Sequence, residues 1–169
     1  MEPQQCGFIF LNLYTKSYYL LFNKALRKLE GIRLTREYKA MQKVLDDAME
    51  KLPVFEQGTD PLLRSAKFTE KEIRKMFKVG KDFTDAGFFS TTHSEEALMD
   101  WMANNPADNV LFKVMGKNGK LIEKASNLPL ESEVLFKSGT TFTVESVNMG
   151  ARHPLDQSKK IVEIILKEK

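Results

Sequence analysis

The spacing of apolar residues changes along this chain, and that change constrains the fold more than any single motif does. Up to about residue 104, apolar side chains mainly recur every three or four positions, whereas from Asn109 onward they alternate. The first spacing is typical of amphipathic helices and the second of strands with one buried face. Helices first and strands later favour an α+β architecture over a doubly wound parallel sheet. We expect a helical N-terminal half packed on a mixed or antiparallel sheet.

Capping residues and helix breakers set the expected limits of the helices. Serine and threonine cap helix N-termini, Thr69 and Glu72 match a capping box, and glycine or proline ends a helix. The helices are expected from Ser17 to Gly31, from Thr35 to Pro53, from Thr69 to Gly80 and from about Ser94 to Asn104.

Runs of β-branched and aromatic residues indicate the strands. Asn118-Gly119 and Ser138-Gly139 are typical hairpin turns, so each is expected to pair the strands that flank it. The strands are expected at Leu62–Arg64, Phe88–Thr92, Val110–Val114, Lys120–Ile122, Val134–Phe136, Thr141–Val144 and Ile161–Leu166.

Length, charge and missing motifs exclude several classes of protein. A chain of 169 residues suits one core, so we expect a single domain over residues 1–169, with residues 1–10 mobile. The 26 Lys and Arg against 23 Asp and Glu form no dense basic block, which argues against a nucleic-acid partner. His93 and His153 lack metal-ligand spacing, so no metal is expected. Neither a Rossmann glycine motif nor a P-loop occurs.

The apolar segment of residues 7–22 could suggest a leader or a membrane span. Asn12, Lys16 and Ser17 interrupt it, and no basic segment precedes it. This pattern predicts a buried helix, with neither a signal peptide nor a membrane partner.

Two glutamates, Glu131 and Glu133, stand where a loop passes into a strand. The strand period of two points their side chains to the same side, and burial of both charges would be costly, so they should line a cleft or face water. A solvated strand edge is the more common reason for such spacing. The alternative is a division of labour, in which neighbouring like charges push the two pKa values apart.

Two upstream features are also open when taken alone. Arg64 suits either a salt bridge at a strand end or a bidentate grip on a phosphate. Ser90, Thr91 and Thr92 suit a strand that ends in a helix cap.

Taken in order, Leu62-Leu63-Arg64, Gly87-Phe88-Phe89-Ser90-Thr91-Thr92 and Glu131-Ser132-Glu133-Val134-Leu135-Phe136 resemble the R-S-E class of mono-ADP-ribosyltransferases. This is the bacterial exoenzyme and toxin family, and the match is to its arginine-specific ExE subgroup. Tyr14 to Arg27 is similar to the family's first helix, and the similarity covers about residues 8–168. The resemblance implies the ADP-ribosyltransferase fold, in which a helical N-terminal half packs on a mixed or antiparallel two-sheet β core with a cleft for NAD as co-substrate.

The resemblance also implies roles for the upstream motifs. Arg64 would bind the NAD phosphates, with Ser65 beside it. Ser90, Thr91 and Thr92 would form the edge of the NAD cleft, and Ser90 would also support the catalytic glutamate.

In the third motif, Glu133 would contact the 2′-hydroxyl of the nicotinamide ribose and stabilise its oxocarbenium-like centre. Glu131 would orient and help deprotonate the guanidinium of the target, since a glutamine at this position goes with asparagine targets in the family. The loop that meets the target protein would comprise Ser126, Asn127, Leu128, Pro129, Leu130 and Glu131.

These roles imply an NAD-dependent protein-arginine mono-ADP-ribosyltransferase, which releases nicotinamide and modifies an accessible arginine of a target protein. Leu63 and Ser65 depart from the aromatic residue and the glycine often found around the arginine. A catalytically silent NAD-binding or interaction domain therefore remains an alternative. A further alternative is an NAD glycohydrolase of the same fold, in which water takes the ribose because no protein target is engaged. We expect a monomer, made in the cytoplasm and secreted or delivered to a host cell by a non-classical route.

Overall fold

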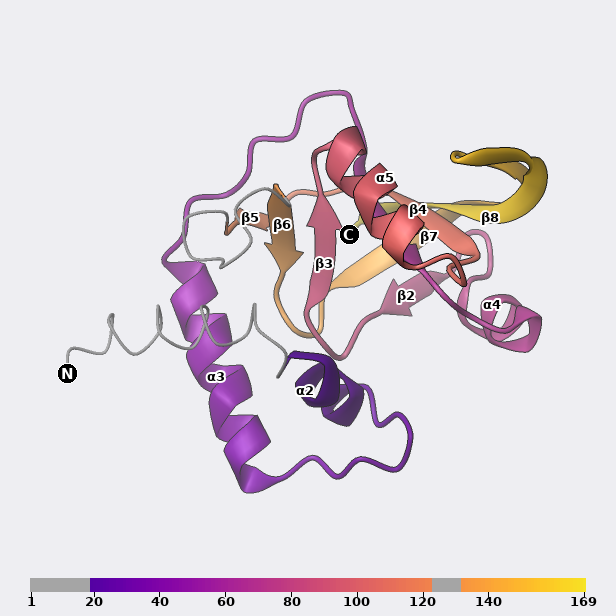
Figure 1. The fold of residues 1–169 in the computed structure, drawn as a ribbon. Coiled ribbons are helices and arrows are strands. Elements are labelled where there is room, and N and C mark those ends of the chain that lie inside the picture. Colours follow the sequence, from indigo (N-terminus) through magenta and orange to yellow (C-terminus); the bar gives the residue numbers. More distant parts are fainter. Residues whose placement is uncertain (1–18, 123–131) are drawn as a thin grey trace. The chain divides into compact units, whose positions relative to one another are not determined.

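The computed structural model describes residues 19–122 and 132–169, and within them it contains four helices and eight strands (Figure 1). The chain divides into two compact units whose segments alternate along the sequence. The helical unit comprises Met1–Phe55, Asp85–Phe89 and Asn118–Thr140, and the sheet unit comprises Glu56–Thr84, Ser90–Lys117 and Thr141–Lys169.

In the helical unit, α2 (Tyr19–Leu26) ends earlier than the sequence predicts. Lys28 adopts a left-handed backbone with a φ of 55°. Its N–H donates to the Ala25 carbonyl, and the N–H of Leu29 donates to the Lys24 carbonyl. This is the hydrogen-bond pattern of a Schellman motif, in which glycine usually holds the left-handed position. The prediction that Gly31 ends the helix is therefore wrong. Ser17, the predicted cap, lies outside the described residues.

Helix α3 (Arg36–Glu50) begins at its predicted cap, because Thr35 Oγ1 accepts a hydrogen bond of 3.2 Å from the N–H of Tyr38. It ends three residues before Pro53, the predicted stop. The apolar side of α3 packs in a core that also takes side chains from α2 and from the later segments of this unit. That core contains Phe22, Leu26, Leu45, Met49, Phe88, Ile122 and Leu135.

Two short strands complete the helical unit. β5 (Lys120–Leu121) and β6 (Glu133–Phe136) pair antiparallel, with Lys120 opposite Leu135. The buried Lys120 ammonium donates to the Leu52 carbonyl at 2.8 Å, beyond the C-terminus of α3. β6 is thereby tied through its partner strand to the segment that follows α3.

The sheet unit contains a mixed sheet in the strand order β2-β7-β8-β4-β1-β3. Strand β4 runs parallel to β8, and the other described pairs in this unit are antiparallel. The expected α+β class with a mixed sheet is confirmed. The strands are β1 (Leu62–Ala66), β2 (Asp82–Thr84), β3 (Phe89–Thr92), β4 (Val110–Met115), β7 (Thr141–His153) and β8 (Asp156–Glu168).

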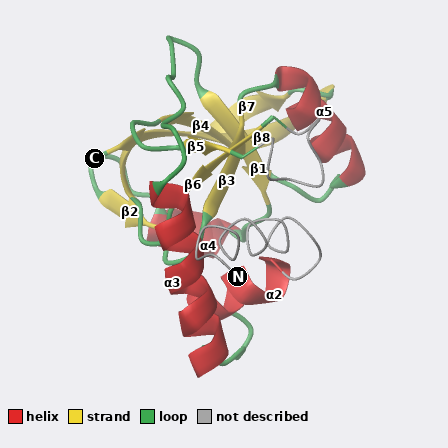
Figure 2. Ribbon diagram, turned by 90° about the vertical axis from the view of Figure 1, so that its left-hand side faces the viewer, coloured by secondary structure: helices red, strands yellow, loops and turns green. Residues whose placement is uncertain are grey.

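Helix α5 (Glu95–Asn104) covers one face of this sheet, as Figures 1 and 2 both show. Ser94 caps it by accepting from the N–H of Ala97, as the sequence predicts. Leu98 and Met102 pack against apolar side chains of β1, β4 and β8. This packing fixes β1 on one side.

Helix α4 (Glu70–Met76) carries the predicted capping box, with both reciprocal bonds between Thr69 and Glu72 formed. The helix ends at Phe77 and not at the predicted Gly80, and the side chain of Phe77 is buried. Its ring packs against three other rings of this unit. The cluster contains Phe68, Phe77, Phe83 and Phe112.

Both predicted hairpins are wrong, because the edges of the strands are occupied by other partners. β4 lies between β1 and β8, which leaves it no edge for the strand that follows Asn118-Gly119. β7 lies between β2 and β8, so the turn at Ser138-Gly139 does not lead into a strand that folds back on its predecessor.

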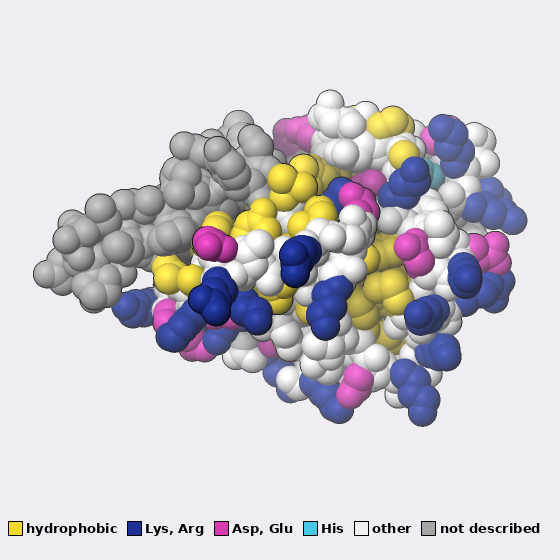
Figure 3. Space-filling view, turned by 90° about the horizontal axis from the view of Figure 1, so that it is seen from below, with side chains coloured by type: hydrophobic (Ala, Val, Ile, Leu, Met, Phe, Trp, Pro, Cys, Tyr) yellow, Lys and Arg dark blue, Asp and Glu magenta, His cyan; other side chains and the backbone are white. Residues whose placement is uncertain are grey.

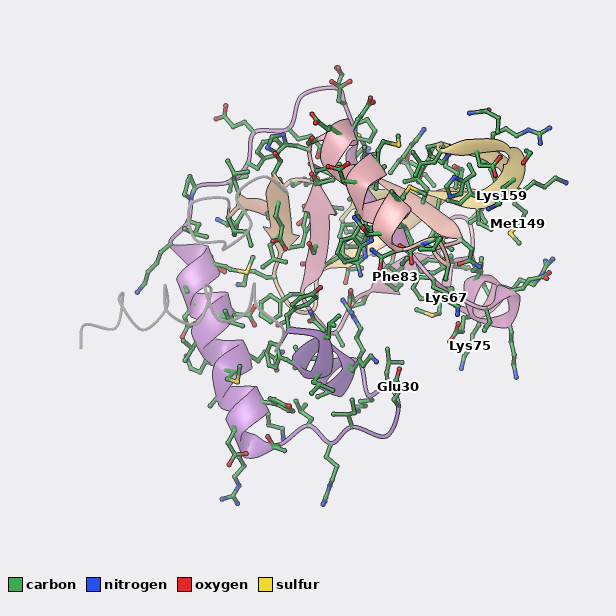
Figure 4. The ribbon with its side chains drawn as sticks, in the orientation of Figure 1. Glu30, Lys67, Lys75, Phe83, Met149 and Lys159 are labelled. Carbon is green, nitrogen blue, oxygen red and sulfur yellow. The ribbon has the colours of Figure 1, made fainter. Side chains whose placement is uncertain are left out.

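The longest pairing in the sheet unit was largely missed. β7 and β8 each run for 13 residues, well beyond the predicted strands Thr141–Val144 and Ile161–Leu166. Figure 4 shows the labelled Met149 and Lys159 near the far end of this hairpin. The extension is exposed and rich in polar residues, so it lacks the alternation by which the sequence reveals half-buried strands.

Candidate active site

The structure brings Arg64 and Ser90 together within the sheet unit. The guanidinium Nη1 of Arg64 donates to the carbonyl oxygen of Ser90 at 3.0 Å. β1 and β3 are antiparallel neighbours with Leu63 opposite Thr92, and this register accounts for the proximity of the two motifs. The arginine is half-buried, whereas its two neighbours along β1 are buried on the other face. Arg64 is thus a positioned cation, and a guanidinium is a side-chain group suited to bind a phosphate.

Ser65 makes a contact that the sequence did not suggest. Its hydroxyl donates to Asp108 Oδ2 at 2.6 Å, and the same oxygen accepts a bond of 3.2 Å from the indole N–H of Trp101. Strand alternation directs Ser65 to the opposite face from Arg64. The contact therefore ties β1 to the segment after α5. No sequence pattern identified Asp108, because it lies in an irregular segment 43 positions away.

The Ser90-Thr91-Thr92 motif lies on β3, where burial alternates as expected for a strand. Thr91 is 3% exposed, whereas Ser90 and Thr92 are half-buried on the other face. Thr92 Oγ1 accepts a bond of 3.1 Å from the N–H of Ser94, which is the cap of α5. The interpretation of this motif as a strand that leads into a capped helix is therefore confirmed, and it leaves a further role for Ser90 open.

Glu133 is the first residue of β6, in the helical unit, and it is only 8% exposed. Its carbonyl oxygen accepts a bond of 3.1 Å from the N–H of Ile122, and β5 pairs alongside the strand. The next three residues of β6 are fully buried. A carboxylate held on such a strand has little freedom to move, which suits a group that must stabilise a charge at one place.

The segment before Glu133 differs from the expected geometry. Ser132 adopts a left-handed backbone with a φ of 48°, and β6 starts only after it. The argument that a strand period of two directs Glu131 and Glu133 to the same side assumes an extended Ser132, and the structure does not show that backbone at Ser132. Glu131 itself and the predicted target loop, residues 126–130, lie outside the described residues.

An ion pair that the sequence did not predict joins Arg27 to Asp85 in the helical unit. The Arg27 guanidinium donates to both carboxylate oxygens, at 2.7 and 2.8 Å, and also to the carbonyl of Phe88 at 3.0 Å. Asp85 is 5% exposed. The sequence offered only a partial signal, because Arg27 ends the first-helix pattern whereas Asp85 stands 58 positions away in a turn.

A second polar cluster anchors the turn after β6 to α3. Asp46 accepts from both the hydroxyl and the N–H of Ser138, at 2.6 and 3.2 Å, and Gln42 donates to the same hydroxyl. Lys137 pairs with Glu50 beside it. Burial raises the pKa of the Asp46 carboxyl above its ordinary value, and the two bonds from Ser138 oppose that shift.

The described residues contain no cluster of His, Cys, Asp and Glu that could hold a metal ion. No helix in this part of the chain is long and apolar enough to cross a membrane. On the face in Figure 3, Lys and Arg side chains are scattered among polar and apolar ones and form no single block.

Comparison with known proteins identifies the family of this chain. A family model described as ADP-ribosyltransferase exoenzyme matches residues 9–168. The chain belongs to the ADP-ribosyltransferase exoenzyme family.

Among curated proteins, the chain is 30% identical over 133 residues to Mav of Mycobacterium avium (strain 104), whose name gives it as a candidate NAD(+)–arginine ADP-ribosyltransferase. The match covers 79% of this chain but only 15% of Mav.

Two solved structures share the fold. The type III effector XopAI from Xanthomonas axonopodis pv. citri matches with a TM-score of 0.77 and 21% identity, over 96% of this chain and 62% of that one. The ADP-ribosyltransferase Vis from Vibrio splendidus, in complex with agmatine, matches with a TM-score of 0.75 and 18% identity. That match covers 96% of this chain and 74% of Vis. The chain therefore spans less than two thirds of XopAI and a small part of Mav.

Proposed function

We propose that this chain is an NAD-dependent protein-arginine mono-ADP-ribosyltransferase, and that residues 1–169 act as one catalytic domain. The observation that carries the proposal is the Glu131-Ser132-Glu133 motif, which stands at the start of β6 in a chain of this family. The name of Mav supports both NAD and arginine, and the agmatine in the Vis complex supports an arginine-like acceptor.

The upstream residues would hold NAD. Arg64 would bind the phosphates with guanidinium N–H groups, while its bond to the Ser90 carbonyl keeps the side chain in place. Ser90, Thr91 and Thr92 would form the edge of the NAD site. For Ser65 we propose a supporting role, since its hydroxyl is directed to Asp108.

Glu133 would act on the reacting centre. When the bond between nicotinamide and ribose breaks, its electron pair leaves with the ring nitrogen and positive charge develops on the ribose. A fixed carboxylate at that position stabilises the transition state more than the ground state. Nicotinamide departs as a neutral amine, so no general acid is required.

Glu131 would act on the acceptor. An arginine side chain is cationic at neutral pH and attacks C1′ of the ribose only as it loses a proton. A carboxylate beside the guanidinium both orients it and accepts that proton. The loop from Ser126 to Leu130 would make further contacts with the target protein.

The protein target would present an accessible arginine, and the chain would act on it as a monomer. We propose that it works as an effector that is delivered to a host cell. The similarity in fold to XopAI, a type III effector, supports this setting.

One assay separates transfer from hydrolysis. The protein is incubated with labelled NAD and agmatine, beside Glu133→Ala and Glu131→Gln variants. Label on agmatine supports the proposal, free ADP-ribose alone indicates an NAD glycohydrolase, and neither product indicates a silent domain. Glu131→Gln should lose transfer to agmatine and keep NAD hydrolysis. Full transfer by that variant would contradict the role of Glu131.

A further inference from the structure

Asp85 is a buried centre of hydrogen bonds within the helical unit. Its carboxylate takes the bidentate guanidinium of Arg27 and also accepts from the N–H of Gly87 at 2.9 Å. One residue further on, the N–H of Phe88 donates to Asn23 Oδ1 at 2.9 Å. Asn23 lies on α2, and Arg27 directly follows this helix. The end of α2 therefore holds the segment from Asp85 to Phe88 through both an ion pair and a neutral hydrogen bond.

The absence of a side chain at Gly87 allows this segment to lie close to Asn23 and Arg27. A Cβ atom at this position would lie 2.7 Å from Asn23 Oδ1 and 3.1 Å from the Nε of Arg27. Real Cβ atoms essentially never come as close as 2.7 Å to another heavy atom, so a larger residue must displace the side chains of Asn23 and Arg27. The glycine in the Gly87-Phe88-Phe89-Ser90-Thr91-Thr92 motif is thus required by packing against Asn23 and Arg27.

The same segment reaches the turn that follows β6. The N–H of Gly139 donates to the Asp85 carbonyl at 2.8 Å, and the N–H of Asp85 donates to the Thr140 carbonyl at 3.1 Å. At its C-terminal end, the segment from Asp85 to Phe88 continues directly into β3, which carries Ser90. Asp85 therefore connects the end of α2, the start of β3 and the turn after the strand that begins with Glu133.

We propose that the Arg27–Asp85 pair, with Asn23 and Gly87, is a positioning device for the catalytic residues. It acts through the segments that carry Ser90 and Glu133 and rests on the proposed function of those residues. Bidentate arginine–carboxylate pairs restrain orientation as well as distance, which a single amide bond does not. Small errors in placement at a reacting centre reduce turnover strongly even when the substrate still binds.

Steady-state kinetics of NAD cleavage with agmatine tests this role. Asp85→Asn keeps the size of the side chain and removes the charge, whereas Gly87→Ala keeps both charges of the ion pair and crowds Asn23 Oδ1 and the Arg27 guanidinium. Each should lower kcat by roughly 10- to 100-fold. KM for NAD should change by less than about threefold, because the phosphate-binding arginine is left in place. Arg27→Lys should not restore activity, since lysine lacks the fork.

Matched controls separate positioning from simple loss of stability. Gly58→Ala adds the same methyl group where nothing lies within 4 Å, and Glu70→Gln breaks the exposed pair with Arg74 on α4. Leu45→Val weakens the core of the same unit. All three should keep the kcat of the unmodified chain while folded. Thermal unfolding of every variant confirms that the assay temperature lies below its transition.

Amide hydrogen exchange supplies a readout that does not depend on activity. In Asp85→Asn and Gly87→Ala, exchange over residues 85–92 and 137–140 should rise at least about tenfold, with no such rise in Gly58→Ala. Unchanged kcat with unchanged exchange would overturn the positioning role, as would a raised KM with unchanged kcat. If Asp85→Asn does not fold, Gly87→Ala decides. If the unmodified chain neither cleaves NAD nor transfers ADP-ribose, the proposed function fails, and exchange alone then decides whether the device holds these segments.

Discussion

Arg64 and Glu133 are charged residues on short strands, yet the two strands hold them differently. β1 lies between β3 and β4, its backbone is extended throughout, and Arg64 points away from its buried neighbours as simple alternation requires. β6 starts at Glu133 itself, directly after the left-handed Ser132. The comparison shows that spacing in the sequence places a side chain only where the backbone stays extended. At the start of a strand, a single residue whose backbone is not extended makes the direction of the preceding side chain unpredictable from spacing.

The roles proposed for the two residues also differ, and the largest effect is expected at Glu133. Glu133→Gln keeps the shape of the side chain and removes the charge that would stabilise the ribose cation. It should lower kcat for nicotinamide release by roughly 100- to 1,000-fold, with little change in KM. Nicotinamide release at saturating NAD measures this. A raised KM with an unchanged kcat would show that Glu133 binds NAD and does not act on the transition state.

Arg64→Lys should give the next largest effect, and of the opposite kind. Lysine keeps the charge but loses the guanidinium fork, which donates to the Ser90 carbonyl and would donate to a phosphate in the proposed role. KM for NAD should rise by roughly tenfold, with kcat within about threefold. Initial rates over a range of NAD concentrations separate the two constants, and Arg74→Lys on the exposed face of α4 is the matched control. A loss confined to kcat would remove the distinction between the two strands.

Substitutions of Ser132 test the strand start directly. A β-branched residue disfavours the left-handed backbone, so Ser132→Val should cost about 1–2 kcal/mol of folding stability. It should also lower transfer to agmatine more than it lowers NAD hydrolysis, because Glu131 precedes Ser132 in the sequence, whereas Glu133 follows it on β6. Ser132→Gly adopts this backbone readily and is the control. Chemical denaturation and the ratio of the two products measure the outcome, and equal behaviour of the two variants would contradict it.

The smallest effect is expected at Asp46, in the cluster that holds the turn after β6. Because burial raises its pKa in the folded chain, its contribution to stability is present below the ordinary aspartate pKa and is lost as pH rises through the raised value. Asp46→Asn removes this titration. The variant should therefore gain thermal stability relative to the unmodified chain at neutral pH more than at pH 4, as scanning calorimetry would show. A gain that does not depend on pH would mean that the burial of the charge is not the cause.

Local rules predicted the local parts of this molecule well. Thr35, Ser94 and the Thr69–Glu72 box cap the helices that they were expected to cap, because a cap depends on residues within one turn. The end of α2 was placed wrongly for a related reason. Hydrogen bonds of the Schellman motif stabilise the left-handed backbone at Lys28. Glycine usually occupies this position, so a lysine there gives no sign in the sequence that the helix ends.

Strand pairing was the weakest part of the prediction. Asn118-Gly119 is a strong hairpin signal, yet the strands on either side of it pair elsewhere. Pairing depends on which strand edges are still open after the whole sheet has formed, and β4 has none. The long β7–β8 hairpin was missed because pairing there needs no buried face.

The sequence by itself determined the α+β class, the N-terminal caps of α3, α4 and α5, and the order of Arg64, Ser90 and Glu133, because each depends on residue type and short-range spacing. Only the tertiary structure decided that Arg64 reaches the Ser90 carbonyl, that Ser132 breaks the alternation before Glu133, and that Arg27 pairs with Asp85. These features join residues tens of positions apart, or depend on a backbone conformation set by packing. The order of the motifs was therefore predictable, and the contacts that hold them were not.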